Sequence, residues 1–280
     1  MKERLLKNTV RTCVLLFLLL LAVHAFEAIV LRMDETFFAE NFINKVFGVV
    51  IIALVLKILS WKWSDIGFSS TGLGKGILTG TALAAISFSA AYLAEILILY
   101  GQGNHISIGF FVTGFSLTGE NVIHQGFGFI LMCIFFNIIN VIMEEGTFRG
   151  LFYGIIRTDH PAKTALLVQA LLFGIWHIVT PLHNLIDGDI DFPSFAMLSV
   201  GYIILAGLMG IKWGLLYRMT GNLYAGMADH FCNNCITTNL LHITTETGTD
   251  ELMIVRIMIA QTLSFLIILA LWMRKNKTRS

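Results

Sequence analysis

Residues 128–157 read GFILMCIFFNIINVIMEEGTFRGLFYGIIR, a stretch that is long and apolar enough to cross a bilayer. Two acids and a base, Glu144, Glu145 and Arg149, nevertheless lie inside it. An ionisable side chain in the hydrocarbon costs about 3 kcal/mol or more, so such residues face the interior of a helix bundle and mark functional sites. The stretch therefore predicts a membrane-spanning helix that lines a buried polar site.

Two other apolar stretches carry residues one helical turn apart. Phe173 and His177 form one pair, and His230 and Asn234 form another. With about 1.5 Å of rise per residue, Glu144, His177 and His230 each fall roughly 18–21 Å from the inner end of their helix. We therefore expect the three clusters to meet in one layer of the bundle.

The composition indicates a polytopic membrane protein. Of the 280 residues, 56% are hydrophobic and 13% are charged. The net charge of +1 gives no broad basic field of the kind that attracts nucleic acid. All four cysteines lie in apolar stretches, so we expect buried thiols and no redox pair at Cys232 and Cys235. We predict an all-α membrane helix bundle that forms one domain over residues 1–280, with the lipid bilayer around it and no nucleic-acid partner.

Eight apolar runs predict the membrane spans. They are 9–31, 43–61, 76–100, 128–157, 163–181, 194–217, 220–240 and 252–273. Each is close to or above the ~20 residues that a spanning helix needs. The longest irregular stretch, 101–123, is expected to lie along the outer interface.

Basic residues orient these spans. With the N-terminus inside, 15 lysines and arginines, Lys212 among them, fall on the inner face, and 3, including Arg256, fall on the outer face. This asymmetry predicts a multi-pass protein of the cell membrane with both termini in the cytoplasm. Residues 1–25 also resemble a signal peptide that ends at Val23-His24-Ala25, but the apolar run continues to Leu31, which favours a retained anchor.

Glu144 and Glu145 are expected to differ in role. Glu145 and Arg149 have the acid-first spacing that favours an ion pair within one helix, so we assign them a supporting role. Glu144 is rotated from Glu145 by about 100°, because a helix has 3.6 residues per turn, and is free to face a cavity. A carboxylate placed there can take a proton from water and later return it.

The two imidazoles and the amide complete this chemistry. His177 could hold the attacking water or protonate a leaving amine, while Phe173 packs beside it. His230 and Asn234 offer N–H donors, which is what an oxyanion hole requires. The three clusters contain no evident side-chain nucleophile. The remaining polar residues of the apolar stretches, His24, Glu27, Glu95 and Asp229, are expected to be mainly structural. Of these, Asp229 beside His230 is the one most expected to support the site.

A zinc site is the alternative use of the same residues. Glu144, His177 and His230 would form a His₂Glu ligand set of the catalytic kind. If Glu144 were a ligand, however, no free base would remain, because Glu145 is committed to Arg149. We therefore favour a site without a cofactor and keep zinc as the alternative.

The order Glu-Glu-x-x-x-Arg, Phe-x-x-x-His and His-x-x-x-Asn resembles the CPBP family, which comprises CAAX proteases and bacteriocin-processing enzymes and is also called Abi. The neighbouring residues agree with it, as in Leu172-Phe-Gly-Ile-Trp-His177. The resemblance covers about residues 140–238. It implies a general base at Glu144, a partner at His177 and an oxyanion site at His230 with Asn234.

By this resemblance the protein is expected to be an intramembrane endopeptidase, a hydrolase that cleaves a peptide or membrane-protein substrate with a glutamate-activated water. Two alternatives remain. One is a bacteriocin-immunity protein that only binds a peptide. The other is a proton-coupled transporter, since buried acids and histidines also build proton relays; inverted repeats and paired Gly/Pro-broken helices, which would support it, are not evident.

Overall fold

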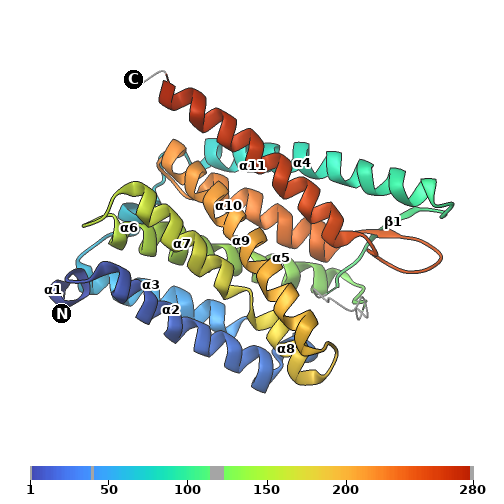
Figure 1. The fold of residues 1–280 in the computed structure, drawn as a ribbon, viewed down its shortest axis with the longest axis horizontal. Helices are drawn as coiled ribbons and strands as arrows, with labels where there is room; N and C mark the ends of the chain where they lie inside the picture. Colours follow the sequence, from blue (N-terminus) through green and yellow to red (C-terminus); the bar gives the residue numbers. More distant parts are fainter. Residues whose placement is uncertain (1, 39–40, 114–122, 278–280) are drawn as a thin grey trace.

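The computed structural model of the chain describes residues 2–38, 41–113 and 123–277. Long helices lie side by side as a bundle (Figure 1). The first half contains α1 (Lys2–Leu6), α2 (Thr9–Phe26), α3 (Ile43–Leu59) and α4 (Leu73–Gly101). The second half contains α5 (Phe127–Glu144), α6 (Tyr153–Ile156), α7 (Ala162–Trp176), α8 (Val179–Asp187), α9 (Phe192–Thr220), α10 (Tyr224–Phe231) and α11 (Met253–Lys277). The predicted all-α fold class is confirmed.

Several of these helices continue into π-helical segments. In the described residues these are η1 (Glu27–Leu31) after α2, η4 (Glu145–Phe152) between α5 and α6, and η5 (Cys232–Leu240) after α10. Short 3₁₀-helices occur at η2 (Met33–Glu35) and η3 (Trp63–Ile66). The π-helix is rare and is found frequently at functional sites. Two of the three π-segments here begin beside residues of the predicted polar site.

Six helical segments of the described chain are long and apolar enough to cross a membrane. They are Thr9–Glu35, Leu73–Gly101, Phe127–Ile156, Ala162–Asp187, Phe192–Thr220 and Met253–Lys277. Each coincides with a predicted span. The other two predicted spans, 43–61 and 220–240, correspond to α3 and to α10 with η5, which are helical but shorter. The protein is a multi-pass membrane protein, whereas the count of eight spans is not confirmed.

A small antiparallel sheet joins two distant segments. Strand β1 (Ser107–Phe110) pairs with β2 (Leu241–Thr244), with Ser107 opposite Thr244 and Phe110 opposite Leu241. The sequence predicts only irregular structure at 101–123, of which residues 114–122 lie outside the described residues. Four-residue strands are too short to give a clear alternating pattern, so the sequence did not indicate them.

Loop residues after β2 fasten this sheet to the bundle. Asp250 lies 2.6 Å from Nδ1 of His242 and 2.9 Å from the guanidinium of Arg256, whose other nitrogen pairs with Glu95 at 2.9 Å. Burial acts to raise the pKa of Asp250, but the hydrogen bond with His242 and the charge of Arg256 hold that pKa below its usual value. Arg256, which the sequence places toward the outer side, is fully buried, where it pairs with Glu95 and Asp250.

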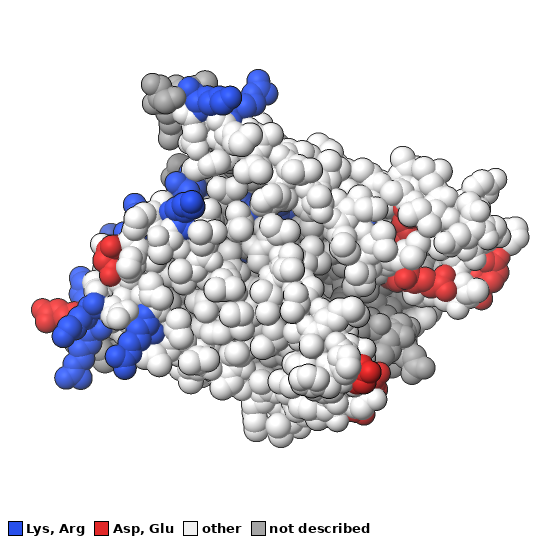
Figure 2. All heavy atoms as spheres, in the orientation of Figure 1, with Lys and Arg blue, Asp and Glu red and all other residues white. Residues whose placement is uncertain are grey.

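Charge separates toward the two ends of the bundle. In Figure 2, Lys and Arg gather at the end where α1 and the C-terminal end of α11 lie, whereas Asp and Glu lie mostly at the opposite end. Lys212 is an exception, because it is fully buried rather than placed on the inner face as predicted. Its ammonium lies 2.6 Å from Oδ2 of Asp229, so a buried partner rather than water satisfies it.

The close approach of α4 to α10 depends on glycine. A Cβ on Gly80 would overlap the carbonyl oxygen of Ala225 and lie 2.9 Å from Cβ of Ala228. One turn earlier, a Cβ on Gly76 would lie 2.8 Å from Cβ of Tyr224. Small residues spaced by four allow helix backbones to pack closely in membranes. Because α10 carries His230, this contact helps to set where that imidazole lies.

We therefore expect Gly80→Ala to destabilise the protein by about 1–3 kcal/mol, the usual cost of overpacking a close contact. Thermal unfolding in detergent measures the effect. Gly74→Ala is the matched control, because a Cβ at Gly74 on the same helix meets no atom within 4 Å. Equal melting temperatures for the two variants would contradict the packing argument.

Candidate active site

The two acids of the first cluster lie at the junction of α5 and η4. Glu144 is the last residue of α5, and Glu145 begins the π-helical segment that contains Arg149. The exposed fractions of their side chains are 8%, 1% and 0% respectively. Buried charges of this kind need partners, and both acids have them.

Glu144 is held through one of its two carboxylate oxygens. Its Oε1 accepts a hydrogen bond of 3.0 Å from Nε1 of Trp176. Its Oε2 is buried, accepts no hydrogen bond from the described residues and lies 3.4 Å from Nε2 of His230. The carboxylate is therefore oriented while one oxygen stays open to a reacting group.

Glu145 is shared by two partners. Its Oε1 lies 3.4 Å from Nη1 of Arg149, as the helical spacing predicted. The same oxygen lies 3.0 Å from Nδ1 of His230, a contact that the sequence did not indicate. Glu145 therefore joins η4 to α10 as well as neutralising Arg149.

Aromatic rings enclose the guanidinium of Arg149. It lies over the ring of Phe173 at 3.8 Å and over the ring of Trp213 at 4.9 Å. Such cation–π contacts stabilise a cation that is removed from water. Phe173 also presents an edge-on contact to His177 and His230, with ring centroids 4.7 and 6.1 Å apart. Phe173 thus packs, as expected, and in addition separates the two imidazoles.

His177 caps the end of α7. Its Nδ1 lies 2.9 Å from the carbonyl oxygen of Phe173, so Nδ1–H donates and Nε2 is left as an acceptor. The preceding residue, Trp176, binds Glu144 directly. The end of α7 therefore supplies both an imidazole and the donor that orients the acid.

His230 and Asn234 bring α10 and η5 into the same site. Nδ2 of Asn234 lies 3.2 Å from Nε2 of His230. The indole of Trp213 stacks on the imidazole of His230 with centroids 4.1 Å apart and an interplanar angle of 15°. The imidazole is thereby fixed on its face and at both nitrogens.

Further residues of the site were missed or given lesser roles in the sequence analysis. Trp176 precedes His177 in the sequence, and nothing in its position indicates that it binds Glu144. Lys212 and Trp213 both bind Oδ2 of Asp229, at 2.6 and 2.7 Å, so Asp229 has the supporting position suggested for it. A lysine in the middle of an apolar run was the available signal for this part of the site.

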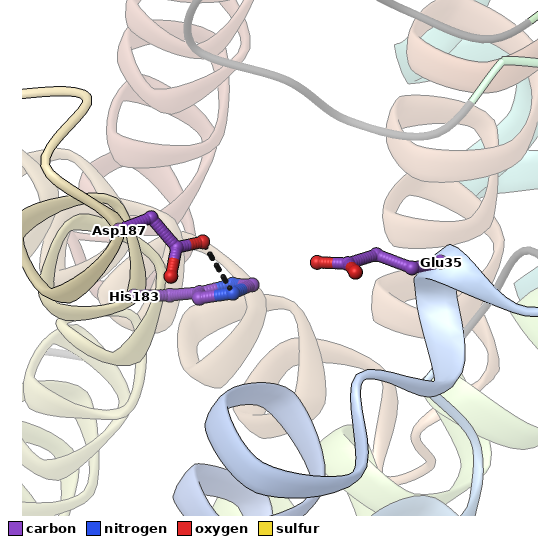
Figure 3. Close-up of side chains that lie close together, drawn as sticks. All are labelled: Glu35, His183 and Asp187. Carbon is purple, nitrogen blue, oxygen red and sulfur yellow. Dashed lines mark ion pairs between the residues drawn. The ribbon is translucent and has the colours of Figure 1, made fainter.

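The candidate zinc ligands do not form a compact set. In the parts of the chain that the structure describes, the group of three whose ligand atoms all lie within 4.8 Å of one another is Glu35, His183 and Asp187 (Figure 3). Arg32 pairs with Glu35 and Asp187, so this group already has a cation. Glu144 and His230 meet this distance, with Oε2 and Nε2 3.4 Å apart, but His177 does not complete a group of three with them.

Residues 126–236 match the family model described as type II CAAX prenyl endopeptidase Rce1-like. This part of the chain is similar to a CAAX protease domain. The match covers about two fifths of the 280 residues and agrees with the resemblance drawn from the three motifs. Comparison with curated proteins and with solved structures found no match.

The matched segment contains every catalytic and supporting residue proposed from the sequence, from Glu144 to Asn234. Helices outside the matched region also reach it. His24 of α2 stacks on Trp176 with ring centroids 4.3 Å apart. The site thus depends on packing beyond the matched segment.

We expect Arg149→Ala to destabilise the protein more than Glu144→Gln does. Removing Arg149 leaves Glu145 buried without its cation, and breaking a buried pair typically costs about 3–5 kcal/mol. Glu144→Gln keeps an acceptor for Trp176 and removes a charge. Thermal unfolding in detergent tests this order, and melting temperatures equal to wild type for both variants would contradict it.

Proposed function

We propose that the protein is an intramembrane endopeptidase that cleaves a peptide or membrane-protein substrate with a water activated by Glu144. The observation that carries this proposal is the state of that carboxylate. Trp176 fixes one oxygen, and the other is buried, accepts no hydrogen bond from the described residues and lies 3.4 Å from Nε2 of His230. A general base needs this combination of orientation and a free acceptor.

The charge balance around the site supports the same role. Three buried acids, Glu144, Glu145 and Asp229, and two buried cations, Arg149 and Lys212, take part in the contacts of the site. Arg149 pairs with Glu145, and Lys212 pairs with Asp229. Within the described part of the chain, Glu144 is the one of these three acids that pairs with neither cation, so a proton taken from water would bring this group of five to neutrality.

The proposed reaction assigns one task to each remaining residue. Nε2 of His177 accepts a hydrogen bond from the water, Glu144 takes the water proton, and the oxygen adds to the carbonyl carbon. An N–H of Asn234 donates to the resulting oxyanion. The C–N bond then breaks as the leaving nitrogen receives the proton, either from Glu144 or through His230, which becomes a donor once it is protonated. The products are a carboxylic acid and an amine.

We expect Glu144→Gln, His177→Ala and His230→Ala each to abolish cleavage, and Asn234→Ala to retain a trace. Loss of one oxyanion donor costs about 10²–10³ in rate, whereas loss of the base removes the nucleophile. The substrates to test are a farnesylated peptide ending in a CAAX sequence, the same peptide without the lipid, and membrane proteins that accumulate in cells lacking activity. Mass spectrometry identifies the products.

Glu27→Gln is the matched control for this experiment. Glu27 is also a fully buried acid, but it accepts hydrogen bonds from Ile43 and Asn44 at the start of α3. Full activity in Glu144→Gln would remove the base from the mechanism. A Glu144→Gln variant that keeps its cellular phenotype without cleavage would favour the peptide-binding alternative.

We further propose that the reaction requires no metal, because assigning Glu144 as a ligand would leave no free base. The purified, active protein is expected to contain no stoichiometric zinc and to keep its activity during chelator titration. Elemental analysis beside the activity assay measures both. Activity that is lost on stripping and restored by zinc alone would make Glu144, His177 and His230 the metal ligands instead.

The charge separation between the two ends of the bundle motivates a proposed topology. Basic residues favour the cytoplasmic side, so we place both termini there, in the cell membrane. Single cysteines introduced at Lys275 and at Asp189 should be labelled by an impermeant reagent from opposite sides. Labelling of the cysteine at 275 from outside would reverse this orientation.

A further inference from the structure

A chain of buried polar side chains leads from α9 to the proposed active site. It starts at Nζ of Lys212, which is fully buried. Besides Asp229, this ammonium contacts Oε1 of Gln261 at 2.5 Å and Oγ of Ser264 at 2.9 Å, both on α11. An ammonium has three donors and no acceptor. All three donors of Lys212 are therefore used, and each partner must accept.

The direction of the following hydrogen bonds is then determined. Oε1 of Gln261 accepts from Lys212, so its Nε2 is the group that faces Oδ1 of Asn233, at 2.9 Å. Nδ2 of Asn233 donates to Oδ1 of Asn234 at 2.7 Å. A side-chain amide has its acceptor oxygen on one side and its donor nitrogen on the other. Each amide that accepts a hydrogen bond from the preceding residue therefore donates one to the next residue. Nδ2 of Asn234 consequently faces Nε2 of His230, at 3.2 Å.

The opposite end of the chain imposes the same direction. Oε1 of the Glu145 carboxylate, which can only accept, lies 3.0 Å from Nδ1 of His230. Nδ1 therefore carries the proton of the neutral imidazole, and Nε2 accepts from Asn234. A donor-only group at one end and an acceptor-only group at the other specify one arrangement of every proton between them.

We propose that Gln261 is a positioning residue of the active site, through which Lys212 fixes the side-chain amide of Asn234 and the tautomer of His230. Its relevance to catalysis rests on the function proposed above for Asn234 and His230. Gln261 lies on α11, outside residues 126–236 that match the family model. The last helix of the chain thus completes the site.

This arrangement prepares two atoms for the reaction. Nε2 of resting His230 is unprotonated and lies 3.4 Å from Oε2 of Glu144, so it can receive the proton that Glu144 takes from water once the N–H of Asn234 leaves its single lone pair. One N–H of Asn234 binds His230, which leaves the second to face a substrate oxygen. If the amide of Asn234 were inverted, an acceptor would face that oxygen and repel it.

The kinetic test compares two buried glutamines. In Gln261→Met the chain is interrupted while side-chain length is kept. Gln169→Met is the control, because Gln169 is also fully buried but donates to the carbonyl oxygens of Leu166 and Gly210, away from the chain. We expect kcat of Gln261→Met to fall about tenfold, or about 1.4 kcal/mol, with KM unchanged. Gln169→Met should stay within about twofold of wild type. Equal kcat values for the two variants would overturn the proposal.

A spectroscopic test needs neither turnover nor a known substrate. Nitrogen NMR of ¹⁵N-histidine protein in lipid bilayers, with His230 assigned by its loss in His230→Gln, reports which ring nitrogen is protonated. Wild type is expected to show a proton on Nδ1 and a hydrogen-bonded, unprotonated Nε2 at neutral pH. The Nε2 signal should shift toward that of a free acceptor in Gln261→Met and not in Gln169→Met.

A proton on Nε2 in the wild-type protein would overturn the proposal, whatever the variants do. The two tests also separate the proposal from the proposed function. Full activity of Glu144→Gln would refute the peptidase mechanism without altering the NMR result. A wild-type enzyme with the expected activity and an Nε2 proton would refute the positioning role alone.

Discussion

The packing of the helices around the site depends on the neutralisation of buried charges by partners within the protein. One oxygen of Glu145 serves both Arg149 and His230, and so ties the helix of the first motif to the helix of the third. Arg149 in turn requires the rings of Phe173 and Trp213 around it. Breaking a buried pair costs several kcal/mol, so these contacts constrain how α5, α7, α9 and α10 pack. The same packing orients Glu144 and, among the described residues, gives it no ion pair with an arginine or lysine.

The sequence predicted those features that depend on spacing within one helix. The Glu145–Arg149 pair and the spans follow from the 3.6-residue period and from hydropathy. It did not predict the bond from Trp176 to Glu144 or the contact of Gln261 with Asn233, because those depend on how separate helices are rotated against each other. Lys212 was placed on the inner face for the same reason: its partner Asp229 lies on another helix. The short strands gave no pattern of their own.

The residues that match the family model are not the only ones whose side chains contact the polar site. The match covers residues 126–236. Yet α2, which precedes it, contributes a ring that stacks on Trp176, and α11, which follows it, contributes Gln261. Segments outside the matched residues therefore reach the polar site. The three motifs alone would assign these helices to the scaffold. Their contacts instead connect α2 to Glu144 through Trp176, and α11 to Asn234 through Asn233.

The π-helical segment that starts at Glu145 has a consequence for how this chain tolerates change in length. A π-turn accommodates one more residue than an α-turn. Deleting one residue between Glu145 and Arg149 would let this turn close as a regular α-turn, and because an α-turn also completes one revolution, the helix after it could keep its facing. The spacing within the segment would change, since Arg149 would then follow Glu145 by three residues instead of four. The residue count between these two partners is thus fixed by the pair itself, whereas the helix beyond them can absorb the change.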